Sequence, residues 1–105
     1  MYVTHSPWGE VQHQLSISKD IVDVMTESHG GLMIKGEALS RLSDNALEYG
    51  ISYEDCMCYE EDCAVLIPIN ELPEVAQAFN YDRQKLESSI QYWYPEYYKL
   101  EGMKL

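Results

Sequence analysis

The residues best suited to carry chemistry begin with a short motif, Ser28-His29-Gly30-Gly31. Adjacent glycines let the backbone adopt positive φ or approach a ligand closely, and histidine is the side chain that titrates near neutral pH. The motif therefore fits a loop that contributes His29, Gly30 and Gly31 to a binding or acid/base site. The alternative is a tight hairpin whose histidine caps a neighbouring carbonyl.

A second motif, Tyr59-Glu60-Glu61-Asp62, places three adjacent carboxylates behind a tyrosine, and Glu54 and Asp55 precede it. Clustered carboxylates can hold Mg²⁺ or Ca²⁺, share a proton in acid/base chemistry, or imitate a run of phosphates. Adjacent side chains on a strand point to opposite faces, and those on a helix are splayed, so the three acids cannot all bind one ion. Acids at a helix N-terminus, which the helix dipole favours, are the alternative interpretation.

The three cysteines, Cys56, Cys58 and Cys63, fall within eight positions and form no pair of Cys-x₂₋₄-Cys units. Structural zinc sites normally use such pairs, so we expect neither a metal nor a cofactor. The N-terminus lacks the layout of a signal peptide, which predicts reduced thiols in a cytoplasmic protein. The neighbouring acids raise a thiol's pKa and so oppose catalytic use of a cysteine.

An aromatic segment, Tyr92-Trp93-Tyr94-Pro95-Glu96-Tyr97-Tyr98, lies near the C-terminus. Aromatic rings can stack on nucleic-acid bases, but proteins that bind in this way also carry a basic groove. Packing in the core or at an interface is the better interpretation, and a homodimer joined through this segment is one form of it.

The strongly negative net charge of the chain argues against several kinds of binding partner. Eighteen Asp and Glu residues against seven Lys and Arg give a formal net charge of −11, and residues 42–82 contain ten acids and neither Lys nor Arg. Such a chain repels nucleic acid and anionic membranes, so we expect no direct contact with either. The charge favours a basic protein partner, including one that itself binds nucleic acid. A solvated surface that only maintains solubility is the alternative.

The pattern of the 105 residues predicts one α+β domain spanning 1–105. Apolar residues alternate over 11–17, and the runs at 21–26 and 32–34 are short and apolar, which predicts an antiparallel meander of about three strands. We expect one later strand at 64–69, with Pro68 near its end, and a loop at 52–62. Helical spacing predicts helices over 37–49 and 72–79 and a third that begins after Asp82 and ends before Pro95.

Four motifs taken in order resemble a family of small uncharacterised domains carried by phages, plasmids and other mobile elements. They are Pro7-Trp8-Gly9, Ser28-His29-Gly30-Gly31, Tyr59-Glu60-Glu61-Asp62 and Trp93-Tyr94-Pro95-Glu96 with Tyr98. The resemblance runs from about residue 5 to about residue 100. It implies a mobile-element setting and one site that unites the second and third motifs, but it implies no reaction.

The resulting hypothesis is an acidic accessory factor, such as an anti-defence inhibitor, that docks onto a basic, nucleic-acid-binding surface of a host protein through residues 44–74. The alternative is a small metal-dependent or acid/base enzyme that uses His29 with Glu60, Glu61 or Asp62. This alternative requires the imidazole to lie within a few Å of one of those carboxylates.

Overall fold

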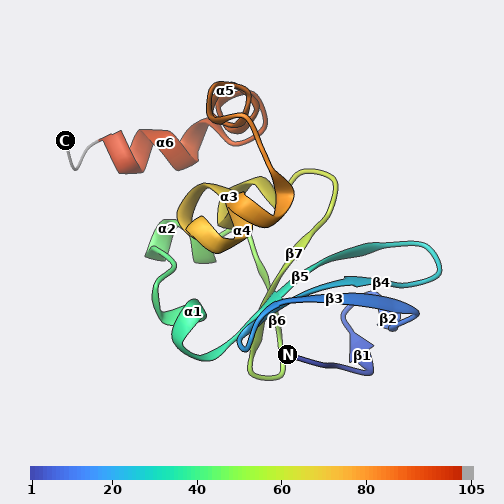
Figure 1. Ribbon diagram of the computed structural model, residues 1–105. Coiled ribbons are helices and arrows are strands. Elements are labelled where there is room, and N and C mark those ends of the chain that lie inside the picture. Colours follow the sequence, from blue (N-terminus) through green and yellow to red (C-terminus); the bar gives the residue numbers. More distant parts are fainter. Residues whose placement is uncertain (103–105) are drawn as a thin grey trace.

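The computed structural model describes the backbone of residues 1–102 and the side chains of residues 1–98 (Figure 1). The chain has an α+β fold built on a five-stranded antiparallel sheet with the strand order β3-β4-β5-β7-β6. A two-stranded ribbon, β1 (His5–Ser6) with β2 (Gly9–Glu10), precedes the sheet.

The predicted N-terminal meander is confirmed. It consists of β3 (His13–Ser18), β4 (Ile21–Met25) and β5 (Gly30–Ile34), each paired antiparallel with the next. Residues 19 and 20 form the first turn, next to a bulge between Ser16 and Ser18. The β-branched residues of β4 and the apolar residues of β5 are buried. Both strands lie inside the sheet, where the two faces are covered.

The prediction of a loop at 52–62 is wrong, because this region contributes a β-hairpin. Its strands are β6 (Ile51–Tyr53) and β7 (Cys56–Glu60), joined by a two-residue turn in which Glu54 has a φ of 54°. β7 lies between β5 and β6 and has buried residues on both faces. A strand covered on both faces shows no alternation of apolar and polar residues, so its sequence had no strand period.

The predicted strand at 64–69 is also wrong, because these residues lead into a helix, α3 (Leu66–Glu71). Pro68 is its third residue, and a proline in the first turn of a helix removes no internal hydrogen bond. Leu66, Ile67, Pro68 and Ile69 are all buried. A helix buried on every side reads as a continuous apolar run, which periodicity alone cannot tell from a buried strand.

The predicted helix at 37–49 is two short helices, α1 (Gly36–Ser40) and α2 (Asp44–Leu47). Ser43 separates them because its side chain accepts a hydrogen bond from the Ala46 N–H and so begins the second helix. The other helices are α4 (Pro73–Phe79), α5 (Arg83–Trp93, capped by Asp82 as predicted) and α6 (Pro95–Gly102).

Both faces of the sheet are covered. The helices lie on one side, where a large core includes Leu32, Ile34 and Tyr59 of the sheet together with Ile67 of α3 and Ile90 of α5. A smaller core on the other face contains Val22, Val24, Met33, Cys56 and Cys58, against which the N-terminal segment and Trp8 pack. Figure 1 shows the helices gathered on one side and β1 and β2 on the other.

Candidate acidic binding site

The first three motifs meet at one end of the sheet. β5 and β7 pair antiparallel, so Gly31 of the second motif lies opposite Glu60 of the third. A β-carbon at Gly31 would lie 2.2 Å from the Tyr59 carbonyl oxygen and 2.7 Å from Cη2 of Trp8. Only glycine allows this approach, so the indole of the first motif packs directly over the backbone of the second.

His29 lies beside Glu60 at the same end. The side chain of Thr26 closes the loop, donating to the His29 carbonyl oxygen at 2.7 Å and accepting from the His29 N–H at 3.1 Å. The imidazole is exposed, and its Nδ1 lies 3.6 Å from Oε1 of Glu60. The histidine therefore faces a carboxylate of the third motif, and the convergence that a shared site requires is present.

Glu61 faces a carboxylate that was absent from the predicted site. Its N–H donates to the Gly30 carbonyl oxygen at 2.9 Å, and a β-carbon at Gly30 would lie 2.9 Å from its Oε2. Burial, and secondarily the charge of Glu61, raise the pKa of Asp23. A cavity of about 220 Å³ opens between them, lined by His13, Gln14, Leu15, Asp23, Val24, Met25 and Glu61. The only sequence signal for Asp23 as a site residue was its position between two valines of a buried strand.

A second cavity, of about 300 Å³, brings in the fourth motif. It is lined by Tyr49, Ile51, Glu60, Asp62, Cys63, Ala64 and Tyr94. The rings of Tyr49 and Tyr94 pack with their centroids 4.8 Å apart. Residues of all four motifs therefore lie near the ends of β5 and β7, with Trp8 on one face of the sheet and Tyr94 on the helix side.

The sequence matches a family model described as Domain of unknown function (DUF7007) over residues 2–105. The chain belongs to this family. This match confirms the predicted resemblance to a family of small uncharacterised domains. Comparison with curated proteins and with solved structures found no match.

Two predicted site residues of this DUF7007 chain lie away from the motif region, and the side chain of a third, Tyr59, is buried behind it. Glu54 and Asp55 form the turn at the opposite end of β7, where they line a separate cavity with His5 and Lys35. At about 3.3 Å per residue, β7 separates the two ends by roughly 13 Å. Tyr59 lies fully buried in the core, where its hydroxyl donates to the Ala46 carbonyl oxygen at 2.8 Å, so it supports the site from behind.

Two of the three cysteines are buried thiols. Cys56 and Cys58 are buried, and burial raises the pKa of Cys56 to about 11 and that of Cys58 to about 12. Cys63 is partly exposed at the second cavity. Among the described residues, no three His, Cys, Asp or Glu side chains form a group that could hold a metal ion. Within the same residues, every helix is too short or too polar to cross a membrane.

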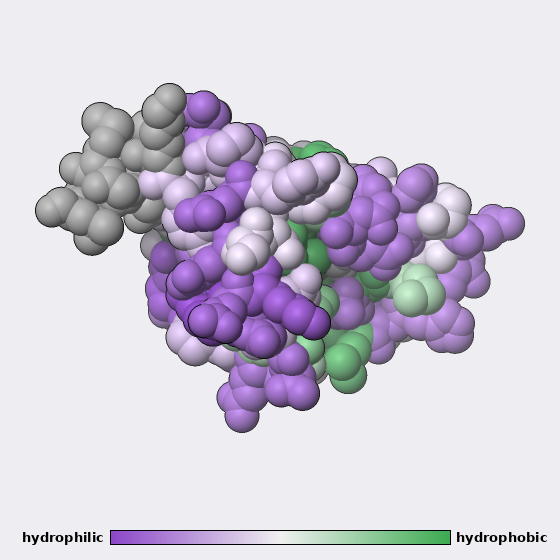
Figure 2. All heavy atoms as spheres, turned by 90° about the horizontal axis from the view of Figure 1, so that it is seen from above, coloured by the Kyte–Doolittle hydropathy of each residue, from purple (hydrophilic) through white to green (hydrophobic). Residues whose placement is uncertain are grey.

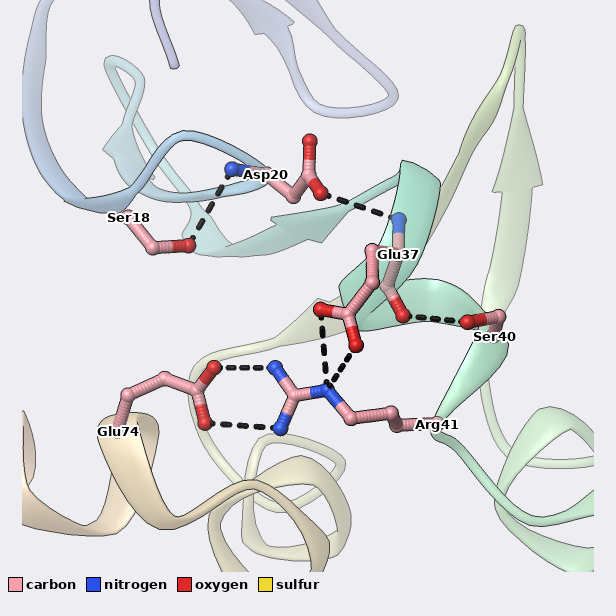
Figure 3. A network of polar contacts seen from close by, with 6 residues as sticks. All are labelled: Ser18, Asp20, Glu37, Ser40, Arg41 and Glu74. Carbon is pink, nitrogen blue, oxygen red and sulfur yellow. Dashed lines mark hydrogen bonds and ion pairs between the residues drawn. The ribbon is translucent and has the colours of Figure 1, made fainter.

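Two acids of the uninterrupted acidic stretch are held by the fold. Arg41 donates from both terminal nitrogens to Glu74 and from Nε to Glu37, as Figure 3 shows. Glu71 accepts from the Ser43 N–H at 2.7 Å, and its second oxygen accepts from the Ser43 and Tyr97 hydroxyls, each at 2.6 Å. These carboxylates tie the helices together.

The carboxylates at the motif region differ. We call Asp23, Glu60, Glu61 and Asp62 the acidic sheet end, and none of them forms an ion pair with a Lys or Arg side chain that the structure describes. Hydrophilic residues cover most of the face seen in Figure 2, with a few apolar residues in a band near its middle. Apart from the His29 imidazole beside Glu60, the acidic sheet end thus carries carboxylates with which no described Lys or Arg side chain forms an ion pair.

Proposed function

We propose that this chain is an acidic binding factor that docks onto a basic surface of a partner protein through the acidic sheet end. The observation that carries the proposal is the gathering of Asp23, Glu60, Glu61 and Asp62 where the motifs converge, with no described Lys or Arg paired to them. The docking region differs from residues 44–74, because Glu71 and Glu74 serve the fold and Asp23 joins the site from β4.

The geometry suits recognition of a macromolecule. Glu60 ends a strand that is paired on both sides, and Glu61 is hydrogen-bonded to β5 through its backbone. Charges fixed on rigid strands lose little conformational entropy on binding, and a one-signed patch attracts an opposite charge and accelerates association. Nucleic acid and anionic membranes carry the wrong sign, which leaves a basic protein surface.

The motif resemblance supplies the setting of the proposal. We place the protein in the cytoplasm of a cell that carries a mobile element, where it acts as an accessory factor or as an inhibitor of host defence. In that role its carboxylates occupy the nucleic-acid-binding groove of a host protein, as a run of phosphates would.

Two triple variants of equal charge test the proposal. Glu60→Gln/Glu61→Gln/Asp62→Asn and Asp44→Asn/Glu54→Gln/Asp55→Asn both change the formal net charge from −11 to −8. Binding to a deca-arginine peptide, measured by calorimetry, should weaken at least tenfold for the first and less than threefold for the second. The affinity of the wild type should fall steeply between 50 and 300 mM salt. Equal losses in the two variants, or an affinity insensitive to salt, would refute a localised acidic site.

One observation favours acid/base catalysis as a second candidate function. Asp23 and Glu61 share the 220 Å³ cavity with His13, and burial raises the pKa of Asp23, the direction that suits a carboxyl group that donates a proton. The test is turnover of generic ester, phosphoester and glycoside substrates by the wild type and by Asp23→Asn. Activity that disappears in the variant supports this function, and a wild type without turnover counts against it.

A further inference from the structure

The 300 Å³ cavity has walls of a particular kind. Tyr49 follows α2, and Tyr94 caps the end of α5, where its N–H donates to the Ile90 carbonyl oxygen. Both tyrosines are partly exposed, and Ile51 and Ala64 add apolar surface. The cavity therefore presents aromatic and aliphatic walls to solvent, at the junction of the third and fourth motifs.

Carboxylates lie near these aromatic walls. Glu60 and Asp62 belong to the lining itself. Burial, followed by the charges of Glu96 and Glu48, raises the pKa of Tyr49, and burial is also the main cause of the raised pKa of Tyr94, to which Glu60 contributes. Both phenols thus remain neutral at physiological pH, and carboxylates beyond the two in the lining lie near them.

This combination selects one class of ligand. Neutral aromatic rings attract a cation over their faces, and carboxylates bind it by charge-assisted hydrogen bonds. A guanidinium is planar, stacks on aromatic rings, pairs with carboxylates through two parallel hydrogen bonds and is less strongly hydrated than an ammonium. The apolar residues Ile51 and Ala64 suit the alkyl stem that carries the guanidinium.

We infer that this cavity receives an arginine side chain of the basic partner, with Tyr49 and Tyr94 against the guanidinium and Glu60 or Asp62 as its ion pair. The inference rests on the proposed function, because it names the group by which the acidic sheet end recognises its partner.

Titration with N-acetyl-arginine amide, followed by the amide resonances of the protein, tests the inference directly. The shifts should concentrate at residues 49, 62–64 and 94. N-acetyl-citrulline amide, which has the same shape without the charge, should give shifts at least fivefold smaller at equal concentration. N-acetyl-lysine amide should bind at least twofold more weakly than the arginine compound. Equal effects of arginine and lysine, shifts elsewhere on the protein, or equal effects of citrulline would overturn the assignment.

Variants separate this inference from the proposed function. Tyr94→Leu retains apolar volume but removes the aromatic face, and Asp62→Asn removes one charge at an exposed position. Each should weaken deca-arginine binding about three- to fivefold, whereas Glu54→Gln, which removes one charge at the far end of β7, should leave it unchanged. Amide spectra of each variant verify the fold. Unchanged binding by Tyr94→Leu and Asp62→Asn, with a loss in the triple variant at 60–62, would overturn the arginine cavity alone. No binding of deca-arginine by the wild type would overturn both proposals.

Discussion

The carboxylates of the helical region and three of the four at the acidic sheet end come from the same acidic stretch, yet they have different roles. Glu71 and Glu74 accept hydrogen bonds or ion pairs from Ser43, Tyr97 and Arg41. Glu61 and Asp62 form no ion pair with a described Lys or Arg side chain.

The two regions differ because different groups lie next to their carboxylates. The helices bring hydroxyls and a guanidinium, which hold the carboxylates in the fold. The sheet end brings glycines, which allow Trp8 and Glu61 to pack closely against the backbone, and the acids there line cavities. A run of acids in a sequence therefore does not by itself define a charged surface, because folding divides it into structural and available groups.

Filling Gly31 is the strongest way to disrupt the sheet end. Gly31→Ala places a β-carbon 2.2 Å from a backbone oxygen and 2.7 Å from the Trp8 ring, so strands and indole must separate. We expect a loss of about 3 kcal/mol or more in the free energy of unfolding. Urea denaturation measures it. Gly9→Ala, where no atom lies within 4 Å but φ is 121°, is the control and should lose only about 1 kcal/mol through backbone strain.

Removing one acid from each region should separate stability from binding. Glu71→Ala leaves the Ser43 N–H and two hydroxyls without their acceptor, which should cost about 2 kcal/mol of stability. Glu61→Ala should change stability by less than about 0.5 kcal/mol but weaken deca-arginine binding. Urea denaturation and calorimetry on the same two variants test both statements. A destabilised Glu61→Ala would show that this acid also serves the fold.

Lowering the pH should change the stability contributions of Glu74 and Asp23 in opposite directions. The pKa of Glu74 is lowered, chiefly by its hydrogen bond from Arg41, so its stabilising contribution is present above the ordinary value of 4.5 and is lost as the pH falls through the folded pKa. The pKa of Asp23 is raised above 3.8 by burial. Its contribution is therefore most favourable below 3.8 and is lost as the pH rises through the folded pKa.

Carboxyl-carbon NMR titration measures both pKa values. Asp23→Asn should gain a small amount of stability relative to the wild type at pH 7 and none at pH 3. A folded pKa of Asp23 at or below 3.8, or of Glu74 at or above 4.5, would contradict this account of the two regions.

The sequence predicted the elements whose signals are local. The alternation of Leu15 and Ile17 with polar residues predicted a half-buried strand, and β3 is a strand although its Leu15 is 63% exposed. Asp82 marked the start of α5. The periodicity of apolar and polar residues did not identify the elements whose apolar residues are buried on more than one side. β7 and α3 have no polar face, so Cys56–Glu60 showed no strand period and Leu66–Ile69 could not be told from a strand.

The candidate site was predicted in part, for a similar reason. The glycines and acids of two motifs indicated chemistry from residue type alone, and the pairing of Gly31 with Glu60 brings them together. No local rule reveals which strands become neighbours, so Asp23 and Tyr49 were missed, and Glu54 and Asp55 were grouped with acids at the other end of their strand.

The indole over Gly31 gives the molecule an internal optical probe. Trp8 packs against the strand that pairs with Glu60, whereas Trp93, the other tryptophan, is 55% exposed on α5. Replacing Trp93 with phenylalanine would leave one fluorophore in contact with the backbone beneath the docking region. Emission from that single ring then reports occupancy of the neighbouring carboxylates without any attached dye.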